Sequence, residues 1–346
     1  MILTLNGDEL KMNLKRVGNQ TMVFANPPVI LASYSVVGPK EGQGPLGQSF
    51  HTVWEDGLHG EKSWEVAESK MLQAAMQGAI DQISFPKEQI DFMLAGDLLN
   101  QIISANYAAR QLALPFIGIY GACSTMALGM ALGSMLIDGG FARNVLVGAS
   151  SHHDTAERQY RLPTEQGAQR AMSSQWTVTG AGSVLLGQFG QGPRITSATI
   201  GRVIDYAIKD VNNMGAAMAP AVADTILNHF LDMQLKPADY NLIASGDLGR
   251  IGLGLACELL KQSGMDIGTS FTDCGVMIYD ESQDVHSGAS GCGCSAVVFA
   301  GDIMQRIKAG ELKKVMLVGS GALHSPTSAL QGESIPGIGH AVVIEG

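Results

Sequence analysis

One cysteine in this chain is placed for nucleophilic chemistry. It lies in the run Gly121-Ala122-Cys123-Ser124-Thr125, between an apolar stretch typical of a strand and an uncharged stretch typical of a helix. The first turn of a helix offers unpaired backbone N–H groups and a partial positive charge, which stabilise a thiolate or a bound anion. A buried, unreactive cysteine would fit the same turn. The residues alone leave both interpretations open.

A polar segment at 151–174 holds the side chains best suited to an anionic ligand. It is too long for an ordinary connection, which is typical of functional or disordered loops, and a second such segment covers 38–60. Arg158 and Arg161 each present a planar guanidinium that matches a carboxylate. Glu157 and Arg158 could instead pair with other side chains and only hold the segment in place. The segment also contains His152, His153, Asp154, Tyr160 and Arg170.

The two neighbouring histidines of this segment differ in the roles that the sequence favours. His153 stands 171 residues before His324 (324 − 153), the spacing that also separates Cys123 from Cys294 (294 − 123). Equivalent positions in two similar segments favour a structural role for His153. His152 has no histidine counterpart, so it is the better candidate for a ligand contact.

The repeated spacing indicates that the chain is a duplicated fold. A second pair of similar segments, 90–98 and 240–248, aligns Asp97 with Asp247 at an offset of 150 (247 − 97). Two copies are too few for a solenoid, which needs roughly three or more repeats to bury a continuous core. We therefore expect two halves, 1–192 and 193–346, that share one core about a pseudo-twofold axis.

The order of helical and strand patterns predicts an α/β protein with a mostly parallel sheet in each half. We expect a five-layer αβαβα arrangement. The expected helices cover 63–83, a segment ending at 110, a segment starting at 124, 221–233, 253–262 and 295–309. The expected strands cover 91–95, 116–120, 145–149, 178–188, 241–244, 276–279, 315–318 and 340–345.

Composition excludes several classes of function. With 46% apolar and 16% charged residues, the 346-residue chain can bury a large core. Its net charge of −10, without clustered basic residues, argues against nonspecific nucleic-acid binding and against a polybasic membrane anchor. The first residues do not resemble a secretory signal, and five cysteines, an odd number, fit a reducing compartment. We expect the protein to fold in a cytosol.

The uncharged stretch 111–137 is long enough for a membrane helix but is better explained as protein core. Pro115 and the turn around Cys123 divide it into a short strand and a helix rich in small residues. Its repeat partner after Cys294 carries charged residues that a membrane-spanning pair would not tolerate. We expect a buried central helix.

The remaining cysteines do not predict a metal site. Cys292 and Cys294 are separated by one glycine, and two thiols at this spacing lack the third and fourth ligands of a zinc centre. Cys257 and Cys274 are distant in sequence from this pair.

Several motifs together resemble the stage V sporulation protein AD family, within the thiolase and ketoacyl synthase superfamily. The resemblance covers nearly the whole chain. Its motifs are the duplication, the turn 121–125, the strand 179–186, Gly44-Pro45-Leu46-Gly47, and the segments 38–41, 95–101, 155–159 and 218–221.

Superfamily membership would imply thioester chemistry with Cys123 as the acylated nucleophile. That chemistry needs a histidine and an asparagine as donors. The resemblance places the histidine where this chain reads Ser245-Gly246-Asp247 and the asparagine at Cys292, so both expected donors are absent. We therefore expect a catalytically inactive homologue, unless the alignment slips by a residue. A histidine could also enter the pocket from elsewhere; the candidates are His153, His324 and His340.

The family resemblance implies binding of dipicolinic acid, pyridine-2,6-dicarboxylate, during its movement into or out of the spore. A planar dianion calls for a helix terminus, a cation and flat apolar walls. The expected ligand-binding residues are Cys123, Ser124, His152, Arg158, Arg161 and Cys292. No cofactor or metal is expected, although calcium could arrive with the ligand. A thioester-using condensing enzyme and a scaffold with a vestigial pocket are the alternatives.

The same resemblance implies partners. Transport of a polar solute requires membrane-spanning helices that this chain lacks, so integral membrane proteins of the same sporulation system are expected. The protein would be made in the forespore cytoplasm and held at the spore inner membrane by these proteins. The superfamily also suggests a homodimer, with the helix at 100–110 and its neighbouring strand near the contact.

Overall fold

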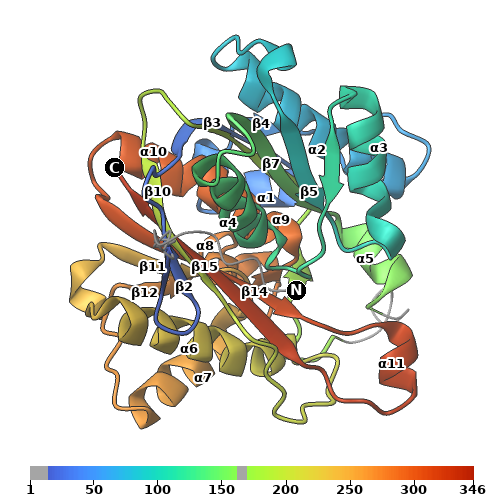
Figure 1. Ribbon diagram of the computed structural model, residues 1–346. Coiled ribbons are helices and arrows are strands. Elements are labelled where there is room, and N and C mark those ends of the chain that lie inside the picture. The colour runs from blue at the N-terminus through green and yellow to red at the C-terminus, as the bar shows by residue number, and fades with distance from the viewer. Residues whose placement is uncertain (1–14, 162–169) are drawn as a thin grey trace, which may run out of the picture.

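The computed structural model describes residues 15–161 and 170–346, and its main sheet repeats one strand order twice (Figure 1). Along the sheet the order is β12-β11-β14-β15-β10 and then β3-β9-β7-β5-β6. Read from its two edges, the sheet therefore presents equivalent strands. In each half, two short strands run parallel to a longer one, and that strand pairs antiparallel with the last strand of the half. This symmetry confirms the duplicated fold.

The bounds of the main-sheet strands are as follows. The first half contains β3 (Val29–Val37), β5 (Phe92–Gly96), β6 (Phe116–Gly118), β7 (Asn144–Ser151) and β9 (Gly180–Gly187). The second half contains β10 (Arg194–Ile200), β11 (Leu242–Ser245), β12 (Phe271–Asp273), β14 (Lys314–Ala322) and β15 (Gly337–Glu345). Shorter strands are β1 (Arg16–Val17), β2 (Thr21–Val23), β4 (Thr52–Val53), β8 (Trp176–Thr177) and β13 (Ala289–Ser290).

The two halves of the main sheet form two of the five layers, and helices form the other three. α2 (Trp64–Asp81) and α3 (Ile103–Leu112) cover the outer face of the first half, and α6 (Met214–Met233) and α7 (Gly249–Gln262) cover that of the second. α4 (Thr125–Asp138) and α9 (Cys292–Val298) lie between the two halves, and α9 continues through one wide turn into α10 (Met304–Lys308). Short helices are α1 (Pro39–Gly42), α5 (His153–Gln159), α8 (Cys274–Met277) and α11 (Pro326–Leu330). The predicted five-layer arrangement is confirmed.

The uncharged stretch forms the middle of the core, as predicted. α4 contacts strands of both halves, and its Met126 and Met130 are fully buried. β14 approaches the start of α4 so closely that it needs a glycine at Gly319, because a Cβ there would lie 3.0 Å from the Cα of Ser124. No helix within the described ranges is both long and apolar enough to cross a membrane.

The strand predicted at 276–279 is wrong. Its first two residues belong to α8, and the strand is β12, which ends at Asp273. Four apolar residues in a row cannot distinguish a strand from a short buried helix. The sequence did not predict β12, because a carboxyl such as that of Asp273 is unusual in a buried strand. In the structure this carboxyl accepts the backbone N–H groups of Leu248 and Gly249 at 2.8 and 2.9 Å. Of the longer strands, β3 and β10 were not anticipated, and neither were the short strands β1, β2, β4, β8 and β13.

Candidate functional site

The cysteine turn is folded by the hydroxyl groups that follow it. Ser124 Oγ donates to the Gly121 carbonyl at 2.5 Å, and Thr125 Oγ1 donates to the Ala122 carbonyl at 2.7 Å. Ala122 has a φ of 48°, a left-handed conformation that a residue with a side chain adopts at a cost. The turn places Cys123 in the wall of a pocket and leaves Ser124 buried behind it. Ser124 therefore shapes the turn instead of lining the pocket.

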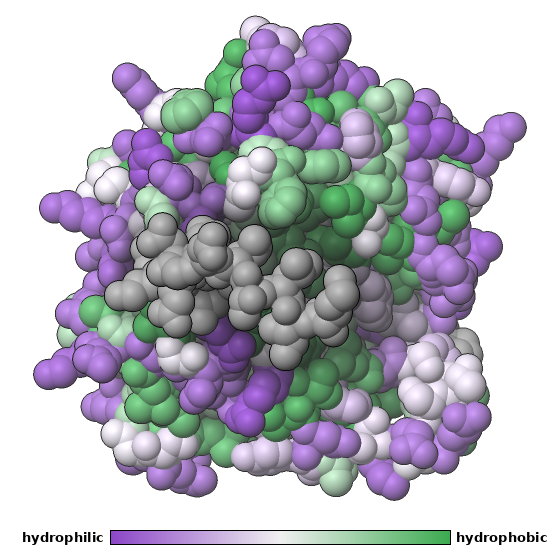
Figure 2. Space-filling view, in the orientation of Figure 1, coloured by the Kyte–Doolittle hydropathy of each residue, from purple (hydrophilic) through white to green (hydrophobic). Residues whose placement is uncertain are grey.

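The pocket beside Cys123 has a volume of about 400 Å³ and mostly apolar walls. Figure 2 shows apolar residues around a hollow between α3 and α11. Tyr120 and Tyr160 contribute aromatic rings, and His324 contributes an imidazole. The other lining residues are Leu98, Leu99, Asn100, Gln101, Ile102, Gly118, Ile119, Met214, Ala322, Ser325 and Pro326.

Asp247 occupies the place where the resemblance expects a catalytic histidine. Its carboxyl accepts the Ser320 hydroxyl at 2.6 Å and the Gly291 N–H at 2.9 Å, and its charge acts on the thiol of Cys123. Burial raises the pKa of Asp247 to about 6. Burial, and then the negative charge of Asp247, raises the pKa of the Cys123 thiol well above its usual value. The site thus holds Cys123 as a neutral thiol.

Cys292 occupies the place of the expected asparagine. It is fully buried, and its thiol donates to the Ala122 carbonyl at 3.0 Å. Burial raises the pKa of this thiol well above its usual value. Because its hydrogen is directed at the backbone of the cysteine turn, Cys292 braces the turn. It does not line the pocket.

Of the three histidines that could have replaced the missing donor, His324 reaches the pocket. Burial lowers its pKa, so the ring is neutral near pH 7. His153 stacks on Trp176 with parallel rings and centroids 3.7 Å apart, and burial lowers its pKa to about 3. His340 lies on β15, outside the pocket lining.

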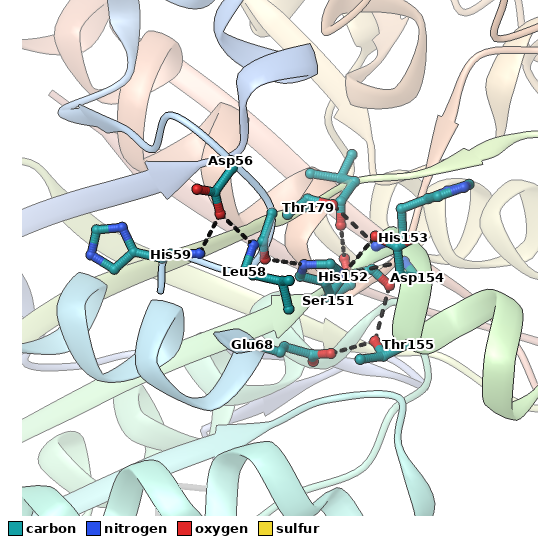
Figure 3. Close-up of polar contacts among 12 residues, drawn as sticks. Asp56, Leu58, His59, Glu68, Ser151, His152, His153, Asp154, Thr155 and Thr179 are labelled. Carbon is teal, nitrogen blue, oxygen red and sulfur yellow. Dashed lines mark hydrogen bonds and ion pairs between the residues drawn. The ribbon is translucent and has the colours of Figure 1, made fainter. Parts of the chain in front are cut away.

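His152 is part of the scaffold. Its Nε2 donates to the Gly57 carbonyl at 2.7 Å, and its Nδ1 accepts the Asp154 N–H at 3.2 Å at the start of α5 (Figure 3). Both ring nitrogens are therefore engaged, and the residue is 1% exposed. The predicted ligand contact through His152 does not fit this arrangement, because the ring ties the 52–60 loop to α5. His153 was the one expected to be structural, so the sequence did not separate the two.

Arg158 lies outside the pocket. Its side chain is 57% exposed, and its Nε lies 3.5 Å from a Glu65 carboxylate oxygen. This is the alternative in which Arg158 holds the segment in place. Arg158 lies on the last turn of α5 and its side chain is outside the pocket. Arg161 lies just beyond the helix, and its side chain is directed toward the cysteine turn.

Arg161 is the cation that the structure brings to the cysteine turn. Its guanidinium donates to the Gln175 carbonyl and to Ser290 Oγ. Its charge opposes the burial-driven rise in the pKa of Cys123, of Asp247 and of Tyr160. Arg161 also borders a small cavity that shares Met214 with the main pocket.

Sequence reasoning missed the buried carboxyl groups behind the pocket. Asp97, the repeat partner of Asp247, accepts backbone N–H groups of Leu99 and Ala105 at 2.8 and 2.7 Å, and burial raises its pKa to about 6. Burial, and then the charge of Asp97, raises the pKa of Glu68 well above its usual value. The repeated Gly-Asp-Leu triplet was the signal that could have found Asp97. Within the described segments, no cluster of three or more His, Cys, Asp or Glu is arranged to hold a metal ion.

Comparison by sequence gives one family over almost the whole chain. The family model described as stage V sporulation protein AD matches residues 18–345. Stage V sporulation protein AD of Bacillus subtilis (strain 168) is 46% identical over 332 residues, covering 96% of this chain and 98% of that protein.

Comparison by structure gives condensing enzymes of the same fold. 3-Oxoacyl-[acyl-carrier-protein] synthase III from Aquifex aeolicus VF5 matches with a TM-score of 0.60 at 13% identity, covering 92% of this chain and all of that one. The corresponding synthase III from Pseudomonas aeruginosa PAO1 matches with a TM-score of 0.56 at 12% identity, covering 92% and 98%. Acetamide-bound OleA from Xanthomonas campestris matches with a TM-score of 0.56 at 12% identity, covering 95% and 100%. The fold is therefore thiolase-like, as predicted.

Proposed function

The chain belongs to the stage V sporulation protein AD family, and from this premise we propose that it binds dipicolinic acid in the pocket beside Cys123. The family resemblance suggests the ligand. The pocket's volume of about 400 Å³ lies in the range of small-molecule sites. Flat walls from Tyr120 and Tyr160 suit a planar aromatic ring, and Arg161 is the nearby partner for a carboxylate.

The observation that carries the proposal is the buried carboxyl of Asp247 beside the thiol of Cys123. A condensing enzyme needs a thiolate and donors that polarise a thioester carbonyl. Here an acceptor faces the thiol, and burial with the charge of Asp247 disfavours the thiolate. The arrangement supports a pocket that binds without forming a covalent bond, so we propose that the protein is not an enzyme.

One observation favours the alternative of a thioester-using enzyme. His324 lines the same pocket as Cys123, and its imidazole is neutral. A neutral imidazole could accept a proton or donate to a carbonyl. No described hydrogen bond joins His324 to the Cys123 sulfur, and for this reason we place binding first.

The proposal includes partners and location. Because no described helix could span a membrane, movement of dipicolinate across one would depend on integral membrane proteins of the same sporulation system. We propose that the protein works at the spore inner membrane with these proteins and forms a homodimer. Calcium would enter as the counterion of dipicolinate. A scaffold without ligand is the remaining alternative.

Calorimetric titration of the purified full-length protein with dipicolinate, with and without calcium, tests the proposal. Benzoate and acetyl-coenzyme A serve as comparison ligands. We expect saturable dipicolinate binding that Cys123→Leu weakens, because the larger side chain fills the pocket. Absence of dipicolinate binding together with acetylation of Cys123 would establish the enzyme instead. Absence of both would leave the scaffold.

A further inference from the structure

One end of the main sheet is formed by paired residues from both halves. Gly187 pairs with Val29, and Arg194 pairs with both Val29 and Glu345. The chain's C-terminus, marked in Figure 1, lies at this end. β7 begins here, whereas the turn of Cys123 follows the opposite end of β6, which runs in the same direction. This end therefore faces away from the pocket.

Two phenylalanine side chains project from adjacent loops at this end. Phe141 is 76% exposed and Phe189 is 78% exposed. The backbone N–H of Gln188 donates to the carbonyl of Arg143 at 2.8 Å, which holds the two loops side by side. The rest of the described chain covers little of either ring, so both rings are free to enter an apolar medium.

Three cations stand at the same end of the sheet. Arg143, Arg194 and Lys313 are exposed, and none has a carboxylate within ion-pair distance in the described part of the chain. They come from three separate places in the sequence, and the row of paired strands brings them to one rim. We call these three residues with Phe141 and Phe189 the basic rim.

Carboxylates near the basic rim are already engaged. Glu345 lies 3.2 Å from the ammonium of Lys314. Asp91 accepts the backbone N–H groups of Arg143 at 2.6 Å and of Asn144 at 3.0 Å. Arg194 donates to the Pro27 carbonyl at 2.8 Å, which leaves its charge unneutralised, so the charges of the rim remain available to an anionic surface although the whole chain carries a net charge of −10.

We propose that the basic rim rests on an anionic phospholipid surface, with Phe141 and Phe189 inserted among the lipids. Arg143, Arg194 and Lys313 face the headgroup phosphates. An aromatic ring beside cations is the combination that holds a protein in a membrane interface. Because the rest of the chain is acidic, repulsion from the same surface orients the molecule with this rim down. The pocket then opens away from the lipid.

Lipid fits the rim better than a second protein does. A stable protein interface buries roughly 800 Å² on each partner and is centred on an apolar patch. The rim offers two separate rings among unpaired cations, which is too little apolar surface for such a centre. The basic rim suits a lipid bilayer with anionic headgroups and an apolar interior. This inference does not depend on the ligand proposed above.

Flotation of the purified full-length protein with vesicles tests the inference. Phosphatidylcholine vesicles with and without phosphatidylglycerol are compared at low and high salt. We expect binding to the anionic vesicles that salt weakens. Phe141→Ser with Phe189→Ser should reduce the binding by about tenfold or more, because each ring loses its burial in lipid. Arg143→Glu with Lys313→Glu should reduce it as well.

Leu330→Ser is the matched control, because Leu330 is also 78% exposed but lies on α11 at the other end of the sheet. It should bind vesicles as the wild type does. Circular dichroism checks that every variant is folded. Absence of binding to anionic vesicles, or equal binding by the double phenylalanine variant, would overturn the inference. If the double phenylalanine variant bound vesicles as the wild type does but no longer bound a membrane protein of the sporulation system, the rim would be a protein interface and the inference would be overturned.

Discussion

The thiol of Cys123 lies beside the buried carboxyl of Asp247, a residue from the other half of the duplicated fold, and the charge of that carboxyl raises the pKa of the thiol. Ser320 Oγ donates to the same carboxyl at 2.6 Å and fixes its orientation. While it is ionised, Asp247 accepts from Ser320 and from the Gly291 N–H and has no hydrogen to donate to a ligand. Cys123 thus presents a neutral thiol to the pocket, with the carboxyl of Asp247 buried behind it.

The duplication explains how this pair arises. Asp97 and Asp247 occupy equivalent turns after β5 and β11, and both carboxyls accept hydrogen bonds from backbone N–H groups. Cys294, the repeat partner of Cys123, donates to the Gly246 carbonyl at 3.3 Å and is completely buried. Only the Cys123 copy opens into the pocket. The two halves thus use one framework for a site and for core packing.

The thiol of Cys123 should react slowly with iodoacetamide at about pH 7, and Asp247→Asn should speed the reaction. The substitution removes the negative charge that, after burial, raises the pKa of the thiol. Each unit by which that pKa falls increases the thiolate fraction about tenfold. Mass spectrometry of the peptide that contains Cys123 measures the rate.

Asp97→Asn is the matched control, since it changes the equivalent carboxyl of the first half without removing a partner of Cys123. It should leave the alkylation rate of Cys123 close to that of the wild type. An equal rate increase in both variants would mean that the pocket had loosened, and it would contradict the assigned role of Asp247.

Arg161→Gln should weaken dipicolinate binding by about tenfold to a hundredfold, because a hydrogen bond to a charged group contributes about 1.5–3 kcal/mol. Arg158→Gln should leave the affinity unchanged, since that side chain is exposed and pairs with Glu65. Calorimetry on both variants provides the comparison. A stronger effect at Arg158 would place the ligand on the α2 side of α5 and refute the proposed pocket.

The sequence predicts the framework better than the contacts. The offsets of 171 and 150 predict the duplication, and short apolar runs predict most strands of the main sheet. These features depend on many residues at once, so single exceptions do not disturb them. The prediction missed β12 because it depended on one short apolar run at 276–279, while the buried carboxyl of Asp273 interrupts the apolar pattern of the strand itself.

Side-chain direction was the part that the sequence could not predict. Arg158 and Arg161 are three residues apart, and the end of α5 between them determines which one turns inward. His152 and His153 differ by one position, yet one ring ties a loop to α5 while the other stacks on Trp176. Partners for such residues come from distant segments, and local patterns do not contain them.

A homodimer should form through the exposed edge of β6, and Ile117→Lys should convert it to a monomer. β6 is the last strand of the sheet, and Ile117 is 39% exposed there. Uncovered edge strands pair readily, and a lysine on the edge opposes that pairing. Light scattering after size-exclusion chromatography measures the mass.

Ile251→Lys provides the control for this prediction, because Ile251 is 36% exposed on α7, which packs against β12, and β12 and β6 stand at opposite ends of the strand order. It should leave the dimer intact. A monomeric wild type at micromolar concentration, or a dimer that persists in Ile117→Lys, would show that the edge of β6 is not the contact.

The buried imidazole of His153 should destabilise the fold as the pH falls below about 6.5, and His153→Phe should remove this contribution. Burial lowers the pKa of His153 to about 3 in the folded protein, whereas an unfolded histidine titrates near 6.5. Between these values the unfolded chain binds a proton that the folded chain does not, so acid favours unfolding. Phenylalanine keeps the stacking on Trp176 and cannot bind the proton. The variant should therefore gain about 1–2 kcal/mol relative to the wild type between about pH 8 and pH 5. Urea unfolding at both pH values measures this difference, and an equal change for the two proteins would show that the imidazole is protonated while the protein is folded.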